Sequence, residues 1–188
     1  MICLLFAIGL FIINPIDVQA NDILPKAGFQ NLIFNIDPIE IERYNYTIEN
    51  HNGFKAYMSY KTITDKTSFQ YKLQKEAYTD EEGFRKFDNR YCVAIGTAFD
   101  VQVGQYFDAQ LKDGTIIKCI VGDIKADCDT DKTNTFTSQG CCLEFIVETN
   151  TLNSTVKITG DCSNLYDEWD SPCSEYIIYN IKYRKESE

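Results

Sequence analysis

The chain has little histidine, tryptophan and proline: its 188 residues include one His, one Trp and four Pro. Catalytic sets that combine Ser, His and Asp, or Cys and His, need a histidine in the site. The single histidine, His51, lies in an N-terminal stretch that is distant in the sequence from the acidic segments. No glycine-rich phosphate-binding loop is present either. The sequence therefore argues against triad hydrolases and phosphate-loop enzymes.

Basic residues are also scarce, with 18 Lys and Arg against 28 Asp and Glu, so the formal net charge is −10. This balance disfavours contact with the phosphates of nucleic acid or with an anionic membrane surface. We therefore expect neither of these as the main partner. An acidic chain suits an extracellular setting, or a polysaccharide that needs no cationic groove.

The N-terminus begins with an uncharged apolar run, MICLLFAIGLFII, over residues 1–13. The run is short for a membrane span, and Asn14 and Pro15 end it. Val18-Gln19-Ala20 then supplies small residues at the positions that signal peptidase inspects. We predict a signal peptide over residues 1–20. The alternative is an uncleaved N-terminal anchor, because no Lys or Arg precedes the run.

Either alternative predicts an exported protein that touches a membrane only if the N-terminal segment is retained. Residues 21–52 are rich in Asn and are interpreted as an arm or linker. The folded domain is expected over residues 53–184. Its size is sufficient for one core, and we expect a monomer without metal or other cofactor.

Aromatic residues are abundant, with 12 Tyr and 12 Phe, which favours β structure. Ser68 is expected to cap a short helix that runs to Lys75. Asp113-Gly114 lies between two apolar runs and predicts a β-hairpin. The expected strands are 54–60, 91–95, 104–111, 115–121, 143–149 and 176–183. The result is a mostly β barrel or sandwich with one or two short helices.

Eight cysteines are present, and Cys3 would leave with the signal peptide. The remaining odd number leaves at least one thiol unpaired in a monomer. We expect a disulfide between Cys162 and Cys173, and a second from Cys128 to either Cys141 or Cys142. Two alternatives stay open: a fully reduced set, or a zinc site. The zinc ligands would be Cys119, Cys128, Cys141 and Cys142.

Two acidic residues in the β-rich part, Asp123 and Glu144, are the candidates for chemistry. Glu144 lies inside an apolar strand, where a carboxylate needs a partner or a function. Asp123 lies in the loop Gly122–Asp127, just before the acidic run Asp127-Cys128-Asp129-Thr130-Asp131. That run lacks the glycine and the terminal glutamate of a calcium loop, which favours a solvated turn.

The segments Tyr91–Gly96, Val103–Asp108, Gly122-Asp123 and Leu143–Val147 together resemble a six-stranded double-psi β-barrel. The barrel is similar to those of three-aspartate domain proteins, lytic transglycosylase A, expansins and rare-lipoprotein-A-like proteins. Residues 53–183 also resemble a group of small exported or phage-linked proteins from gut Firmicutes. The family's Thr-Gly-Gly after the loop Asp is replaced here by Ile124-Lys125-Ala126.

The resemblance implies a lytic transglycosylase in which one carboxylic acid serves as general acid and then as general base on peptidoglycan. Glu144 and Asp123 would be catalytic, and Tyr57, Lys125 and Trp169 would contact the substrate. Each has a structural alternative. Asp123 could bond loop amides, Glu144 could pair with Lys118 or Lys125, and Trp169 could be a packing anchor. The competing function is a non-catalytic extracellular glycan-binding or structural barrel, as in expansins.

Overall fold

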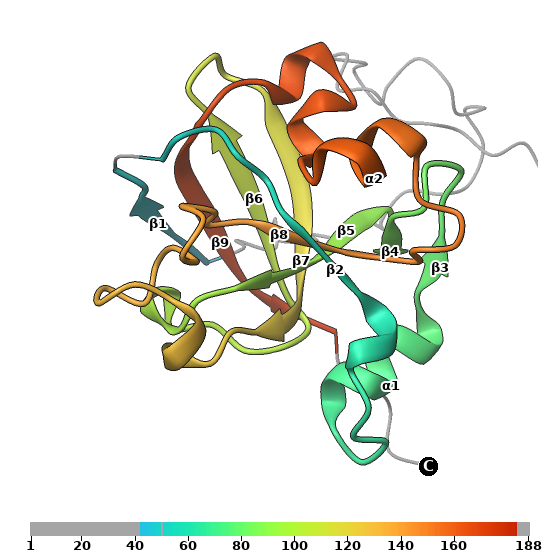
Figure 1. The fold of residues 1–188 in the computed structure, drawn as a ribbon. Helices are drawn as coiled ribbons and strands as arrows, with labels where there is room; N and C mark the ends of the chain where they lie inside the picture. Colours follow the sequence, from blue (N-terminus) through green and yellow to red (C-terminus); the bar gives the residue numbers. More distant parts are fainter. Residues whose placement is uncertain (1–41, 50, 184–188) are drawn as a thin grey trace, which may run out of the picture. The chain divides into compact units, whose positions relative to one another are not determined.

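A computed structural model describes residues 42–49 and 51–183. Its described part is mostly β, with nine strands, two short α-helices and five 3₁₀ turns. The strands are β1 Arg43–Thr47, β2 Tyr57–Ser59, β3 Tyr78–Thr79, β4 Arg85–Phe87, β5 Arg90–Ile95, β6 Gln105–Leu111, β7 Ile116–Ile124, β8 Glu144–Val147 and β9 Cys173–Lys182. The helices are α1 Phe69–Glu76 and α2 Ser154–Thr159, at opposite ends of the sheet (Figure 1). The 3₁₀ turns are η1 Tyr60–Thr62, η2 Thr97–Phe99, η3 Asp127–Asp129, η4 Cys162–Asn164 and η5 Asp167–Trp169.

The sheet branches at β5. Its main path runs β1-β9-β6-β7-β5-β4-β3, and β8 joins β5 on one side and β2 on the other. β4 pairs with Arg90 and Tyr91 at the start of β5, whereas β8 pairs with Val93 and Ala94 further along. Because these two strands share one edge of β5, the sheet divides there. The described strands number nine and do not close, so the expected closed six-stranded barrel is corrected to an open, branched sheet.

The expected helix and the expected hairpin are both confirmed. Ser68 caps α1, with its hydroxyl accepting a hydrogen bond from the Tyr71 amide at 3.1 Å. In the hairpin between β6 and β7, the Asp113 carboxylate accepts from the Thr115 amide at 2.9 Å. Gly114 adopts φ +94°, which a residue with a side chain rarely does. Local turn and cap chemistry was therefore sufficient to predict these elements.

Three features were not expected from the sequence. β1 falls within the predicted arm, and it pairs antiparallel with β9 from Arg43 opposite Tyr179 to Thr47 opposite Glu175. β3 and β4 form a short antiparallel ladder where no strand was expected. α2 follows Asn153, whose side chain accepts from the Thr155 amide at 2.8 Å. Part of the predicted arm thus belongs to the sheet.

Two hydrophobic clusters lie on opposite faces of β5 and β8. Val93, Ile95 and Phe145 belong to the larger cluster. Cys92 and Ile146 belong to the smaller one, together with Leu73 of α1. This alternation along each strand is expected of a strand that is buried on both faces.

No helix in residues 42–49 and 51–183 has the length and apolar character that a membrane crossing requires. The predicted signal peptide over residues 1–20, and the arm up to residue 41, lie outside the described residues.

Candidate functional site

A β-bulge in β7 determines which way Asp123 faces. Val93 of β5 pairs with Val121, but the next residue, Ala94, pairs with Asp123, so Gly122 is an extra residue on β7. A β carbon at Gly122 would lie 2.5 Å from Cδ1 of Ile146, so glycine allows the close approach of these strands. Without the bulge, Asp123 would project from the opposite face.

The bulge brings the two predicted acids to either side of one small residue. Ala94 pairs with Asp123 on β7 and with Glu144 on β8. Residues in direct register project from the same face, so both carboxylates flank Ala94, with backbones two strand spacings, about 10 Å, apart. The two acids are candidates from the sequence alone, whereas the bulge that aligns them is not predictable from it.

Lys125 is the cation of this site. Its Nζ forms an ion pair with Oε2 of Glu144. The pair is mostly buried, with side-chain exposures of 20% for Lys125 and 13% for Glu144. Of the two pairings considered for Glu144, the one with Lys125 is confirmed. The Glu144 carboxylate is thus already engaged by a protein group.

Asp123 has a different environment. Burial raises the pKa of its carboxyl group. A hydrogen bond from the Ile124 amide at 2.9 Å, a side-chain hydrogen bond with Gln70 and the charge of Lys125 act in the opposite direction on that pKa. Burial is the largest of these effects, so the neutral form is favoured relative to a free aspartate.

Glu144 and Tyr57 line an open, polar groove with a volume of about 650 Å³. Its wall comes from four segments: the stretch before β2, the start of β8, the loop before β8 and the end of α2. The lining residues are Asn52, Phe54, Ala56, Tyr57, Gln139, Glu144, Thr159 and Gly160. Two amides, two hydroxyl groups, a carboxylate and two aromatic rings therefore share one surface. Tyr57 and Glu144 were candidates from the sequence, whereas Asn52, Gln139 and Thr159 were not, because their segments are distant in the sequence.

Trp169 is not available as a sugar-stacking platform. Its side chain is buried, with 5% exposure, and it stacks on Phe145 with ring centroids 5.1 Å apart and planes 5° apart. Phe84 and Tyr91 form T-shaped contacts with it, with ring centroids 5.9 and 5.3 Å away. The predicted substrate contact at Trp169 is therefore corrected to a core position. Burial in this aromatic cluster removes the large apolar surface of the indole ring from water, which stabilises the fold.

The acidic run after β7 lies in a turn, and the Thr97 hydroxyl donates a hydrogen bond to its Asp127 at 2.6 Å. Asp131 accepts hydrogen bonds from the Thr133 hydroxyl at 2.7 Å and from the Thr135 and Phe136 amides at 3.0 and 3.1 Å. These hydrogen bonds lower the pKa of Asp131. The oxygens of Asp131 accept these hydrogen bonds within the turn, and Asp127 and Asp129 of the same run are exposed to solvent.

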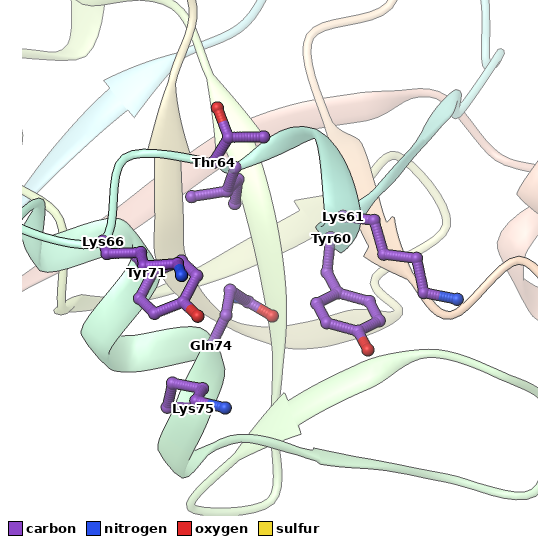
Figure 2. Close-up of a pocket in the computed structure, with 8 residues that line it drawn as sticks. Tyr60, Lys61, Thr64, Lys66, Tyr71, Gln74 and Lys75 are labelled. Atoms are coloured by element: carbon purple, nitrogen blue, oxygen red, sulfur yellow. The ribbon is translucent and has the colours of Figure 1, made fainter.

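A second hollow, of about 380 Å³, lies between η1 and α1 (Figure 2). Figure 2 shows Gln74 between the rings of Tyr60 and Tyr71. The Gln74 oxygen accepts from Nε of Arg85 at 3.2 Å, and the guanidinium of Arg85 lies 4.7 Å from the Tyr60 ring centre. Three lysines also line the hollow: Lys61, Lys66 and Lys75. No sequence motif indicated this hollow.

All seven cysteines in the described residues are free thiols. Cys162 and Cys173, the expected disulfide, are both fully buried and unbonded. Cys128 is exposed, whereas its two proposed partners, Cys141 and Cys142, are buried. In the part of the chain that the structure describes, the one group with metal-ligand geometry is His51, Cys142 and Cys173, not the four cysteines that the sequence analysis considered.

No protein-family model, curated protein or solved structure matches this chain. The resemblance to double-psi barrels stays a prediction, and the function has to be argued from the geometry of the site. The class defined by that geometry is a mostly β protein with an open polar groove and an ion-paired carboxylate on its wall.

Proposed function

We propose that the chain is an exported, non-catalytic protein that binds cell-wall glycan in the groove lined by Tyr57 and Glu144. The observation that carries this proposal is the ion pair between Glu144 and Lys125 on the wall of that groove. This ion pair occupies the one carboxylate among the residues that line the groove, and the remaining lining residues offer polar groups that can form hydrogen bonds with a ligand.

The lining of the groove suits a neutral sugar chain. Phe54 and Tyr57 provide aromatic rings, on which the C–H faces of sugar rings can pack. Asn52 and Gln139 provide amides that donate and accept, which matches sugar hydroxyl and acetamido groups. The groove is open rather than enclosed, so a polymer could pass through it. The net charge of −10 poses no obstacle to an uncharged ligand.

A second candidate function, lytic transglycosylase, is favoured by one observation on Asp123. Burial raises the pKa of that carboxyl group, as the acid catalyst of a glycosidase requires. Asp123 would then act alone as acid and base, since Glu144 is engaged by Lys125. We rank this function second because the residues that line the groove include Glu144 and not Asp123.

We also propose a distant relationship with double-psi barrels. Two parallel strand pairs, β2 with β8 and β5 with β7, occur in a sheet whose other pairs are antiparallel. Parallel pairs require crossover connections, and such connections are also expected from the double-psi resemblance. They support the relationship without requiring the barrel to close.

The test is calorimetric titration of the full chain with tetra-N-acetylglucosamine, together with a pull-down on purified peptidoglycan. We expect binding to wild type and a loss of at least tenfold in affinity for Tyr57→Ala and Glu144→Gln. Tyr44→Ala is the matched control, because Tyr44 is 44% exposed and lies on β1, outside the groove.

The enzymatic alternative is tested in the same preparations. Wild type and Asp123→Asn are incubated with peptidoglycan, and the soluble products are examined by mass spectrometry for anhydro-muropeptides. Binding without such products supports the proposal. Anhydro products that disappear in Asp123→Asn would replace it with the transglycosylase.

A further inference from the structure

Three buried side chains meet where the loop before β8 approaches the start of β9. They are His51, Cys142 and Cys173, which are 4%, 2% and 0% exposed. Their ligand atoms all lie within 4.8 Å of one another. The glycan groove does not use them, since none of the three is among its lining residues. Such a cluster suggests a metal site or a pair of thiols that can be oxidised.

The hydrogen bonds of His51 distinguish these possibilities. Its Nδ1 lies 2.8 Å from the Cys173 amide nitrogen, and an amide N–H can only donate, so Nδ1 is the acceptor. Its Nε2 lies 3.0 Å from the Phe54 carbonyl oxygen, which can only accept, so Nε2 carries the proton. Both nitrogens of the neutral ring are thus committed, and a metal ion would have to displace one of these bonds.

We propose that Cys142 and Cys173 form a disulfide when the chain folds under oxidising conditions. The bond would join the residue two positions before β8 to the first residue of β9. The disulfide would form beside His51, which has a ring nitrogen within 4.8 Å of both sulfurs.

Other buried thiols have backbone partners of their own. Sγ of Cys141 donates to the Leu143 carbonyl at 2.8 Å, and Sγ of Cys119 donates to the Ile117 carbonyl at 3.4 Å. Sγ of Cys162 contacts the Ala56 carbonyl at 3.7 Å. Cys173 is therefore better placed to bond with Cys142 than with Cys162, its partner in the sequence-based prediction.

The chemistry balances with a low-molecular-weight disulfide, such as oxidised glutathione, as the oxidant. One cysteine thiolate attacks it and releases one glutathione thiolate, giving a mixed disulfide. The second cysteine thiolate attacks the protein sulfur of that mixed disulfide and releases the other glutathione. The protein loses two protons and two electrons, and the oxidant becomes two molecules of glutathione.

Burial determines when this exchange can occur. Both sulfurs are enclosed in the folded protein, and burial raises the pKa of the Cys142 thiol well above its usual range. The folded, reduced protein should therefore react slowly. A chain refolding from denaturant exposes both thiols and should form the bond readily.

The test is refolding of the denatured, reduced full chain in a glutathione redox buffer, followed by alkylation, proteolysis without reduction and mass spectrometry. We expect a linked peptide pair that contains Cys142 and Cys173. We also expect Tm to be about 10 °C higher in the oxidised than in the reduced protein, from the entropy that cross-linking removes from the unfolded chain.

Cys142→Ser and Cys173→Ser should lose the oxidant-dependent rise in Tm, whereas the matched control Cys162→Ser should keep it. The mapping on wild type needs no variant to fold. Eight free thiols in the full chain after oxidative refolding, or a linked pair that contains Cys162, would overturn the proposal. So would stoichiometric zinc in purified wild type that is lost in His51→Ala.

Discussion

At the scale of single residues, Lys55 is a fully buried cation held by backbone oxygens. Its Nζ donates to the carbonyls of Gly53, Trp169 and Ser171 at 2.9, 2.6 and 2.9 Å. Lys55→Met keeps an unbranched side chain as far as Cε but removes Nζ, which leaves three carbonyls without this donor. We expect a loss of about 3 kcal/mol in the free energy of unfolding, measured by urea denaturation.

The control for this prediction is Lys112→Met, because Lys112 is exposed in the hairpin turn. Its unfolding free energy should stay within about 0.5 kcal/mol of wild type. Equal effects of the two substitutions would show that the three carbonyl contacts of Lys55 do not stabilise the fold.

The ion pair between Lys125 and Glu144 predicts a coupling energy. Lys125→Met leaves a largely buried carboxylate without its partner and should cost about 1–2 kcal/mol, less than for a fully buried pair because both groups retain some exposure. Adding Glu144→Gln should recover much of this loss. Chemical denaturation of the two single variants and the double variant measures the coupling, and strictly additive effects would argue against the pair.

Asp123 should make stability depend on pH. Because burial raises its folded pKa, ionising Asp123 costs more in the folded than in the unfolded chain. That cost is present above the folded pKa and disappears as pH falls below the unfolded value. Asp123→Asn should therefore be more stable than wild type at about pH 7 and equal to it at about pH 3. A difference that grows toward low pH would contradict this sign.

Much of the site could be predicted at this scale, and the errors have a physical cause. Glu144 was a candidate because it is an acid within an apolar strand. Lys118 and Lys125 were considered as its partners, and the structure shows the ion pair with Lys125. Trp169 was expected to contact the substrate, although a lone tryptophan between two cysteines is more often a packing anchor, which is what the structure shows. The contacts of Trp169 with Phe84, Tyr91 and Phe145, which are distant in the sequence, place its side chain in the core.

At the scale of elements, the bulge in β7 positions the site. Gly122→Val would place methyl groups against Ile146 and Cys92, where even a β carbon lies at 2.5 and 3.2 Å. We expect a loss of about 2 kcal/mol in unfolding free energy, measured by denaturation, and weaker glycan binding. The control is Ala126→Val, because Ala126 is exposed and lies just after β7. Its unfolding free energy should differ from wild type by no more than about 0.5 kcal/mol. A Gly122→Val protein with wild-type stability would contradict the close packing.

The sequence predicted elements well where local chemistry decides them. The Ser68 cap and the Asp113-Gly114 turn each act within a few residues, so α1 and the hairpin between β6 and β7 were found. The bulge at Gly122 was not predictable, because it depends on the approach of Ile146 from another strand. β1 was missed for the same reason: it is highly polar and becomes a strand by pairing with β9.

At the scale of the whole molecule, a mostly β fold was predicted correctly and the closed barrel was not. Amino-acid composition and the alternation of apolar and polar residues identify strands. They do not show which strands pair with one another, or along which edge. The branch at β5 arises because β4 and β8 share one of its edges. The groove is a product of the same arrangement, since it joins Asn52, Gln139 and Thr159 from three distant segments.

The central claim is that this groove holds a glycan, and amide chemical-shift mapping tests it most directly. The labelled full chain is titrated with tetra-N-acetylglucosamine while its backbone amide signals are followed by NMR. The account predicts that the largest shifts cluster at Tyr57, Gln139, Glu144 and Thr159 and saturate with ligand. Shifts confined to the hollow between Tyr60 and Lys75, or no shifts at any ligand concentration, would contradict it.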